Sequence, residues 1–205
     1  MAAGETVKRK KARTGSRPAR RRLGPDARRS ELLEAALKVL KEMGPESARV
    51  EDITRVAGAA KGTFYLYFSS WNDLLVAVRD HLVSTYAAQV RSRFEAATAL
   101  RWTVIENECV RFIDFIVVLG DLHEAVFHGA SMECPTSKER SADRLIAEMI
   151  TRGIAAGACR PVSAELAAPL LFSVLHATAD SIARNGNRKA KLDTVLELLR
   201  AWLRA

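Results

Sequence analysis

The sequence lacks several features that mark membrane, secreted and disulfide-stabilised proteins. No run of about 18 apolar residues occurs, so we expect no membrane-spanning helix. The charged N-terminus is not followed by an apolar segment, which argues against a secretory signal. Cys109, Cys134 and Cys159 are odd in number and widely spaced, so we expect free, buried thiols. These absences favour a cytoplasmic protein.

Proline and strand-like patterns are also scarce. Proline occurs six times in 205 residues, and no segment alternates β-branched residues with turn signals. The hydrophobic fraction of 48% is ample for a packed core. We therefore predict an all-α fold, in a chain long enough for one domain or for a small module fused to a larger one.

Motifs of catalysis and of metal binding are missing as well. The sequence has no glycine-rich phosphate loop and no Gly-x-Ser-x-Gly motif, so we predict no enzyme, no catalytic residues and no cofactor. It has no Cys-x-x-Cys or His-x-x-x-His pair. His123 and His128 are five residues apart, a spacing that places them on different faces of an α-helix. We therefore predict no metal site.

The positive charge is concentrated at the N-terminus. Residues 1–25 contain nine lysines and arginines against Glu5, so this segment accounts for the whole net charge of +8. Because it has no apolar periodicity, we predict a disordered basic tail. Two roles stay open: the tail follows DNA phosphates, or it is a solvated extension that adds only non-specific attraction.

Apolar periodicity predicts nine helices. The first is capped by Asp26, and the pairs Ser70 with Asp73 and Thr136 with Glu139 have the spacing of capping boxes at two later helix starts. The predicted helices cover about residues 26–44, 50–57, 61–68, 70–94, 102–120, 122–130, 136–157, 166–185 and 192–203.

Residues 50–68 have the pattern of a helix-turn-helix, two short helices joined by Gly58-Ala59-Ala60. Phe64 and Phe68 are four residues apart, so we predict that they anchor the second helix in the core. The rest of this helix offers a cation, a hydroxyl and two phenols, groups that suit a groove flanked by phosphates. These residues are Lys61, Thr63, Tyr65 and Tyr67. Gly62 would allow another backbone to approach closely.

Over about 50 residues this pattern resembles the DNA-binding domain of the tetracycline-repressor (TetR) family. Leu32–Gly44 is an apolar helix that ends in glycine, and Val50–Leu75 reads VEDITRVAGAAKGTFYLYFSSWNDLL. The second segment contains an Ile-x-x-x-Ala-Gly turn and a Gly-Thr-Phe-Tyr-x-x-Phe motif. The resemblance implies a cytoplasmic, nucleoid-associated regulator with a DNA-binding domain at 26–71 and a ligand-binding and dimerisation domain at 72–205.

The resemblance also implies which residues face DNA: Lys61, Gly62, Thr63, Tyr65 and Tyr67. Thr63 or Lys61 would reach base edges, while the tyrosines would bind phosphate. Four residues depart from the usual family pattern, namely Arg49, Thr54, Ala60 and Trp71. Arg49 stands where Thr or Ser often caps the first short helix, and we expect it to bind phosphate instead.

For the rest of the chain the resemblance implies a pocket for a small-molecule effector, apolar with a few polar anchors. The candidate lining residues are Trp102, Cys109, Phe112, Phe115, His123, Phe127, His128, Met132, Phe172 and His176. The alternative for each aromatic residue is a place in the core. Because these candidates include no acidic cluster, the sequence favours a neutral or apolar effector, whose identity it does not give.

The last two predicted helices carry long apolar stripes, which exceed what one domain edge needs to bury. We predict that they pair with a second copy across a two-fold axis, as the resemblance implies, through Leu166, Leu170, Val174, Leu192, Leu196, Leu199 and Trp202. A two-fold dimer would read a palindromic operator in double-stranded DNA. The alternative is that these helices only pack on those around the pocket.

Two functions are compatible with these patterns. We predict a dimeric transcriptional regulator, a repressor that a small apolar ligand releases from its operator. The alternative is a helical carrier of apolar ligands, whose basic tail attracts nucleic acid or membrane non-specifically.

Overall fold

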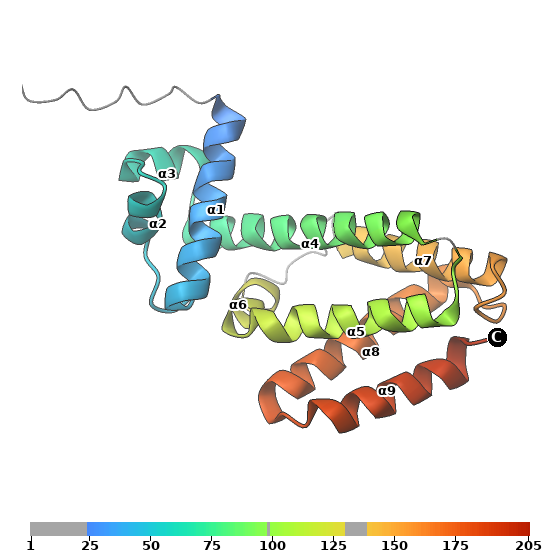
Figure 1. Cartoon of the computed structure of the whole chain (residues 1–205). Coiled ribbons are helices and arrows are strands. Elements are labelled where there is room, and N and C mark those ends of the chain that lie inside the picture. The colour runs from blue at the N-terminus through green and yellow to red at the C-terminus, as the bar shows by residue number, and fades with distance from the viewer. Residues whose placement is uncertain (1–23, 98, 130–138) are drawn as a thin grey trace, which may run out of the picture.

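A computed structural model describes residues 24–97, 99–129 and 139–205, and these form nine α-helices and one π-helical turn without a β-strand. The predicted all-α fold is thus confirmed. Helices α2 (Val50–Val56) and α3 (Lys61–Tyr67) lie beside α1 (Pro25–Met43) at one end of the molecule. From there α4 (Trp71–Ala96) runs along the molecule to the larger helical body (Figure 1).

The larger body consists of the helices after α4. They are α5 (Trp102–Leu119), α6 (Asp121–His123), the π-helical turn η1 (Glu124–His128), α7 (Glu139–Ala155), α8 (Ala164–Asn185) and α9 (Arg188–Leu203). The predicted capping box of Thr136 and Glu139, the pocket candidate Met132 and the thiol of Cys134 involve positions outside the described residues or side chains. Cys109 and Cys159 are buried free thiols, as predicted.

Helix α1 begins one residue earlier than predicted. Gly24 is its N-terminal cap and Pro25 its first residue, where the missing N–H of proline costs no hydrogen bond. The prediction that Asp26 caps the helix is therefore wrong, and Asp26 instead lies in the first turn, where its charge favours the helix dipole. The helix ends at Gly44, which has φ +78° and donates its N–H to the carbonyl of Leu40.

Helix α4 starts at the predicted cap, Ser70. The Ser70 hydroxyl accepts the backbone N–H of Asp73 at 3.0 Å, as expected of a capping serine. The Asp73 carboxylate accepts the backbone N–H of Ser69 at 2.8 Å, one residue before the partner that the capping box predicts. Both interactions fix the corner at which the chain leaves α3 and enters the long helix.

Two apolar cores organise the molecule. The N-terminal core consists of buried residues Leu32, Leu33, Ala35, Ala36, Val39, Leu40, Ala48, Ile53, Phe64, Phe68, Leu74, Leu75, Ala77, Val78, Leu82, Leu122 and Val126. The C-terminal core consists of buried residues Val90, Phe94, Trp102, Ile105, Cys109, Ile113, Ile116, Met149, Ile150, Cys159, Ala164, Ala167, Leu171, Leu175, Ala179, Ile182, Leu192, Val195, Leu199 and Leu203. The first half of α4 thus belongs to the N-terminal core and the second half to the C-terminal core.

The N-terminal core crosses the predicted domain boundary at residue 71. Leu74, Val78 and Leu82 of α4 pack in it together with helices α1 to α3. Leu122 of α6 and Val126 of η1 also lie in it, although they follow α5 in the chain. The division at residue 71 remains a prediction, but the apolar packing on its two sides is continuous.

The π-helical turn is the main departure from the predicted elements. Residues 122–130 are predicted as one short α-helix, whereas α6 gives way to η1 at Glu124. The backbone N–H of Gly129 donates to the carbonyl of Glu124 at 2.9 Å, five residues back. A π-turn contains more residues per turn than an α-helix, so residues five apart approach the same face.

Removal of the α3 anchor tests the N-terminal core. Phe64 is fully buried, so Phe64→Ala should lower the free energy of unfolding by about 3–5 kcal/mol because it removes a buried ring and leaves a cavity. The neighbouring Tyr65→Ala, on the exposed side of α3, should cost much less. Urea denaturation followed by circular dichroism measures both. Equal, small losses would contradict the assignment of Phe64 as the anchor.

Candidate nucleic-acid interface and effector pocket

Helix α3 has one buried and one exposed face. Phe64 and Phe68 are both fully buried in the N-terminal core, with their ring centroids 5.4 Å apart. The predicted anchor is thus confirmed. On the other side, Tyr65 is 50% exposed and Leu66 is 81% exposed. Leu66 was not among the predicted site residues, because the sequence does not distinguish an exposed leucine from a core leucine.

The turn between α2 and α3 sets the orientation of this exposed face. Gly58 has φ +56°, a conformation that favours glycine, and the N–H of Ala59 donates to the carbonyl of Thr54 at 2.8 Å. Thr54, one of the four departures from the family pattern, is buried. Its hydroxyl donates to the carbonyl of Glu51 at 3.2 Å, so the motif accommodates this side chain with its polar group hydrogen-bonded.

The predicted DNA-facing residues of α3 differ in exposure. Lys61, Gly62 and Tyr65 are exposed. Thr63 is half-buried, and Tyr67 is half-buried against the N-terminal core. A Cβ atom at Gly62 would meet no heavy atom within 4 Å, so packing within the protein does not require glycine there. The open space over Gly62 is available to another molecule.

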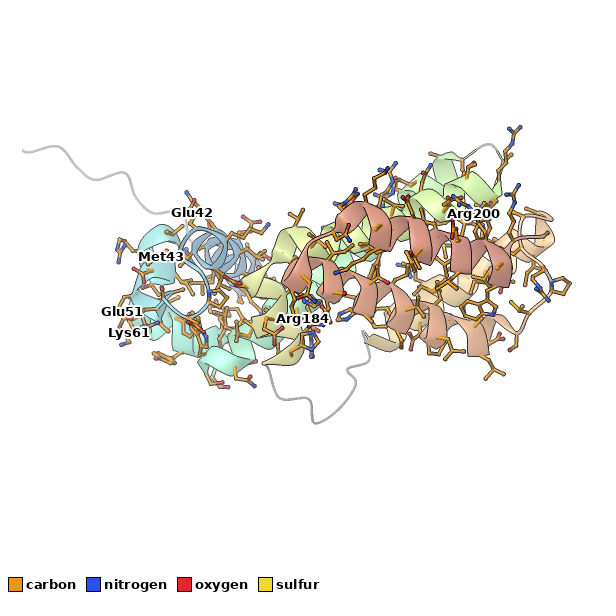
Figure 2. All side chains as sticks on the ribbon, turned by 90° about the horizontal axis from the view of Figure 1, so that it is seen from below. Glu42, Met43, Glu51, Lys61, Arg184 and Arg200 are labelled. Carbon is orange, nitrogen blue, oxygen red and sulfur yellow. The ribbon has the colours of Figure 1, made fainter. Side chains whose placement is uncertain are left out.

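Without DNA, Lys61 forms an ion pair within the protein. Its ammonium donates to the Glu51 carboxylate of α2 at 2.6 Å, and Figure 2 shows the two residues side by side, far from Arg200 in α9. The hydrogen bond raises the pKa of Lys61 and lowers the pKa of Glu51. Both side chains are well exposed, so water and salt weaken the pair, and a phosphate could replace the carboxylate. Helical periodicity cannot reveal such a pair, because its members lie on different helices.

Arg49 is held at the start of α2. One terminal nitrogen of its guanidinium, Nη1, donates to the carbonyls of Glu46 at 2.6 Å and Ala48 at 2.9 Å. Its backbone N–H donates to the Asp52 carboxylate at 3.1 Å, which ties down the residue before the helix. Arg49 is exposed, and these contacts place its charge beside the helix-turn-helix.

A cavity of about 390 Å³ lies between α4, α5, η1, α7 and α8. This volume suits a small organic ligand. Its lining residues are Val83, Tyr86, Ala87, Phe112, Phe115, Ile116, Phe127, His128, Asp143, Leu145, Ile146, Pro169, Phe172, Ser173 and His176. The predicted candidates Phe112, Phe115, Phe127, Phe172 and His176 are therefore brought together, along with His128.

Three predicted lining residues lie outside the cavity lining, and one of them, His123, is buried beside its polar end. Trp102 and Cys109 are buried members of the C-terminal core and do not line the cavity. Both lie on the side of α5 that packs against other helices. An apolar stripe in the sequence does not show whether its residues pack against other helices or line a pocket. Tyr86 of α4 packs against the C-terminal core and also forms part of the cavity wall.

The wall of the cavity is largely aromatic. Tyr86 stacks on Phe115 with ring centroids 4.6 Å apart, and Phe112 contacts Phe172 with centroids 5.7 Å apart. Burial raises the pKa of Tyr86, so its phenol stays neutral at physiological pH. Outside the cavity, Arg93 donates two hydrogen bonds to Glu108, at 2.7 and 2.8 Å, and this ties α4 to α5.

One end of the cavity is polar. His123 Nε2 lies 3.0 Å from His176 Nε2, and the Asp180 carboxylate faces His123, His128 and His176 at 3.5 to 3.6 Å. The prediction that His123 and His128 lie on different faces is wrong, because the π-turn brings their ring centroids within 5.1 Å. Burial lowers the pKa of His123 to about 4 and also lowers the pKa of His176, so both imidazoles are neutral near pH 7.

The outer side of α8 is an exposed apolar stripe. Leu166 is 73% exposed, Leu170 is 59% exposed and Val174 is also exposed. Leu198 of α9 is exposed on the same protomer. The predicted interface positions on α8 are therefore available to a partner.

The predicted interface positions on α9 are largely covered within the chain itself. Leu192 and Leu199 are buried in the C-terminal core of the same chain, and Leu196 and Trp202 are partly buried against it. Arg188, at the start of α9, donates two hydrogen bonds to Asp114 of α5, each at 2.8 Å, which holds α9 on its own body. The apolar stripe of α9 mainly serves folding, which is the alternative that the sequence left open.

Helix α8 is also long and apolar enough to cross a membrane, judged by length and composition over the described residues. Core helices of globular proteins share this composition. Leu171, Leu175 and Ile182 on one side of α8 lie in the C-terminal core, whereas the opposite stripe is exposed.

Two protein-family models match the chain. Residues 32–78 match the model described as bacterial regulatory proteins, tetR family. Residues 102–205 match the model described as tetracyclin repressor-like, C-terminal domain. The second match alone covers more than half of the 205 residues.

A curated relative and two solved structures are similar to the chain. It is 40% identical over 75 residues to YvdT, an uncharacterized HTH-type transcriptional regulator of Bacillus subtilis; this match spans 37% of the chain and only 38% of YvdT. A TetR-family regulator from Pectobacterium atrosepticum has a TM-score of 0.72 at 19% identity, covering 86% of this chain and 92% of its own. FadR of Bacillus subtilis, in complex with stearoyl-CoA, has a TM-score of 0.61 at 19% identity, covering 83% and 96%.

The structural likeness extends over both bodies of the molecule, and at these identities it establishes the fold. The two family models cover the helix-turn-helix and the helical body in turn. The chain therefore belongs to the TetR family of helix-turn-helix transcriptional regulators.

Proposed function

We propose that the protein is a dimeric repressor that binds a palindromic DNA operator through α3 and is released by a small apolar ligand. The observation that carries this proposal is the two-faced α3. Phe64 and Phe68 hold it in the core, which leaves Lys61, Gly62 and Tyr65 directed outward. An ammonium, a bare backbone and a phenol suit contact with phosphates and groove edges.

The exposed stripe of α8 supports dimerisation. Leu166, Leu170 and Val174 form an apolar surface that water covers only at a free-energy cost. A second copy supplies the same stripe, so a two-fold contact buries both. The dimer would then present two α3 helices to successive major grooves, about 34–36 Å apart.

Release by a ligand is supported by the aromatic cavity. Phe112, Phe115 and Phe172 offer stacking and apolar contact, and a neutral or apolar molecule would fill it. FadR, a structural neighbour, was solved with stearoyl-CoA, so a related fold accommodates a ligand with a long apolar chain. A coupling of about 1–3 kcal/mol between pocket and operator would suffice for release.

The carrier function is less well supported. It would use the cavity but gives no role to the exposed cation, glycine and phenol of α3. It also requires the basic tail to supply all affinity for nucleic acid, which would then be non-specific and sensitive to salt. The following experiment distinguishes the two functions.

Operator binding should depend on α3. We expect the double variant Lys61→Ala/Tyr65→Ala to lose about 1–3 kcal/mol of affinity for DNA from upstream of the protein's own gene. Fluorescence anisotropy at several salt concentrations measures this, with scrambled DNA for comparison. Lys189→Ala, an exposed lysine of α9, is the control and should bind as wild type. Equal binding to both DNAs, abolished only by removal of residues 1–25, would support the carrier function.

Gly62 provides a test that separates folding from DNA contact. Gly62→Ala should not lower stability, because the new methyl group meets nothing within 4 Å and alanine favours a helix. It should weaken operator binding, because the methyl group occupies the space into which the DNA backbone fits. Thermal unfolding and anisotropy are measured on the same preparation. Unchanged operator affinity would show that DNA does not approach α3 at this position.

The dimer interface is tested on α8. Leu170→Glu should convert the dimer to a monomer with retained helicity, because it places a charge in an apolar contact while the side chain is 59% exposed in the protomer. Sedimentation velocity gives the oligomeric state. The control is Leu66→Glu, an exposed leucine of α3 outside the stripe, which should remain dimeric. A dimeric Leu170→Glu variant would place the interface elsewhere.

A further inference from the structure

Three of the four histidines of the chain gather around one carboxylate. His123, His128, His176 and Asp180 each offer one ligand atom, and these four atoms all lie within 4.8 Å of one another. The fourth histidine, His81, lies apart on α4. The cluster closes the polar end of the cavity, and His128 and His176 line both.

Two local features of the backbone assemble this cluster. His176 and Asp180 are four residues apart on α8, so they share a face of that helix. His123 and His128 are five residues apart, and only the π-turn η1 directs both toward α8. Single π-helical turns inside helices occur frequently at functional sites. The turn therefore gives a specific geometry to residues that an ordinary helix would separate.

The separations suit a small divalent ion. In a tetrahedral zinc site, ligands about 2.0–2.2 Å from the metal lie roughly 3.3 Å from one another. Here the separation of His123 Nε2 and His176 Nε2 is 3.0 Å. The Asp180 carboxylate approaches other ring nitrogens of the same histidines, at 3.5 Å from His123 Nδ1 and 3.6 Å from His176 Nδ1, and lies 3.6 Å from His128 Nε2. With one ligand atom taken from each residue, the four atoms lie within 4.8 Å of one another. Small side-chain rotations would bring four donors to metal-binding distances.

The surroundings also suit a metal. Phe127 stacks on His123 with centroids 4.9 Å apart, and Phe172 contacts His176 with centroids 5.4 Å apart. Such an apolar shell limits access of water and keeps the rings in place. Imidazole with carboxylate is a donor set typical of zinc and related transition metals, whereas calcium and magnesium prefer oxygen ligands.

We propose that His123, His128, His176 and Asp180 form a binding site for one divalent transition-metal ion, with Zn²⁺ as the best-fitting ion. The site lies at the polar end of the effector pocket and is separate from the α3 surface.

The metal would join two parts of the molecule. His176 and Asp180 belong to α8, whose other residues pack in the C-terminal core. His123 and His128 flank Val126, which is buried in the N-terminal core with Phe64 of α3. An ion that bridges α8 and η1 would thus fix the position of a segment packed beneath the helix-turn-helix. Given the proposed function, metal loading should change operator affinity.

Metal binding is tested on the untagged, chelator-treated protein with Co²⁺ as a spectroscopic probe and Zn²⁺ as competitor. We expect one Co²⁺ per protomer, the visible absorption of a four-coordinate site, and its displacement by Zn²⁺. His176→Gln and the nearly isosteric Asp180→Asn should each weaken Zn²⁺ binding by at least about tenfold, since even outer-shell changes have effects of that size. His81→Gln is the matched control and should bind as wild type.

Several outcomes would overturn the site. They are absence of a saturable Co²⁺ spectrum, wild-type affinity in folded His176→Gln and Asp180→Asn, or equal loss in His81→Gln. The cluster would then be a hydrogen-bonded anchor for an organic ligand. Circular dichroism checks the fold of each variant. Operator affinity with and without Zn²⁺ is measured separately, so that a metal-loaded protein with unchanged DNA binding would refute the coupling and retain the site.

Discussion

The packing of α6 and η1 into the N-terminal core is the contact on which the connection between the two bodies depends. Leu122 and Val126 are buried there, against the same stretch of α4 that supports α1, α2 and α3. Interiors are packed as densely as organic crystals, so a displaced side chain must displace its neighbours. A shift of η1 therefore cannot stay local: it changes the surface on which the helix-turn-helix rests.

The aromatic cavity is built around this contact. Phe127 of η1 lines the cavity and packs on the N-terminal core. Phe115 of α5 lines the cavity and is partly buried against both cores. A ligand that repositions either ring acts on groups that the two bodies share. The aromatic wall and the histidine cluster both include residues of α6 and η1. Phe127 belongs to the wall, and His123 and His128 belong to the cluster.

The sequence predicts best those features that one helix determines alone. The four-residue spacing of Phe64 and Phe68 is enough to define the buried face of α3, and therefore its exposed face. The sequence predicts less well the features that depend on how two helices pack. Trp102 and Cys109 have side chains that suit a pocket but lie in the core. Leu192 and Leu199 are covered by other helices of the same chain. An apolar stripe indicates that a surface is covered without indicating what covers it.

The π-turn shows a different limit. The sequence rules applied to residues 122–130 assume 3.6 residues per turn, which separates His123 from His128. A single five-residue hydrogen bond, from Gly129 to Glu124, reverses that conclusion. The spacing of His176 and Asp180 was readable from the sequence, but a histidine and an aspartate four residues apart are too common to indicate a site alone. The pair indicates a site only together with His123 of α6 and His128 of η1.

The most direct test of the proposed connection between the cavity and DNA binding is hydrogen exchange on the protein with and without the proposed operator DNA. Coupling is reciprocal, so DNA binding at α3 must alter the pocket if the pocket controls DNA binding. The predicted result is a change in amide protection that extends from α2 and α3 through the first half of α4 to α6, η1 and the facing part of α8. Protection confined to α2 and α3 would contradict the account, because it would show that the two bodies respond independently.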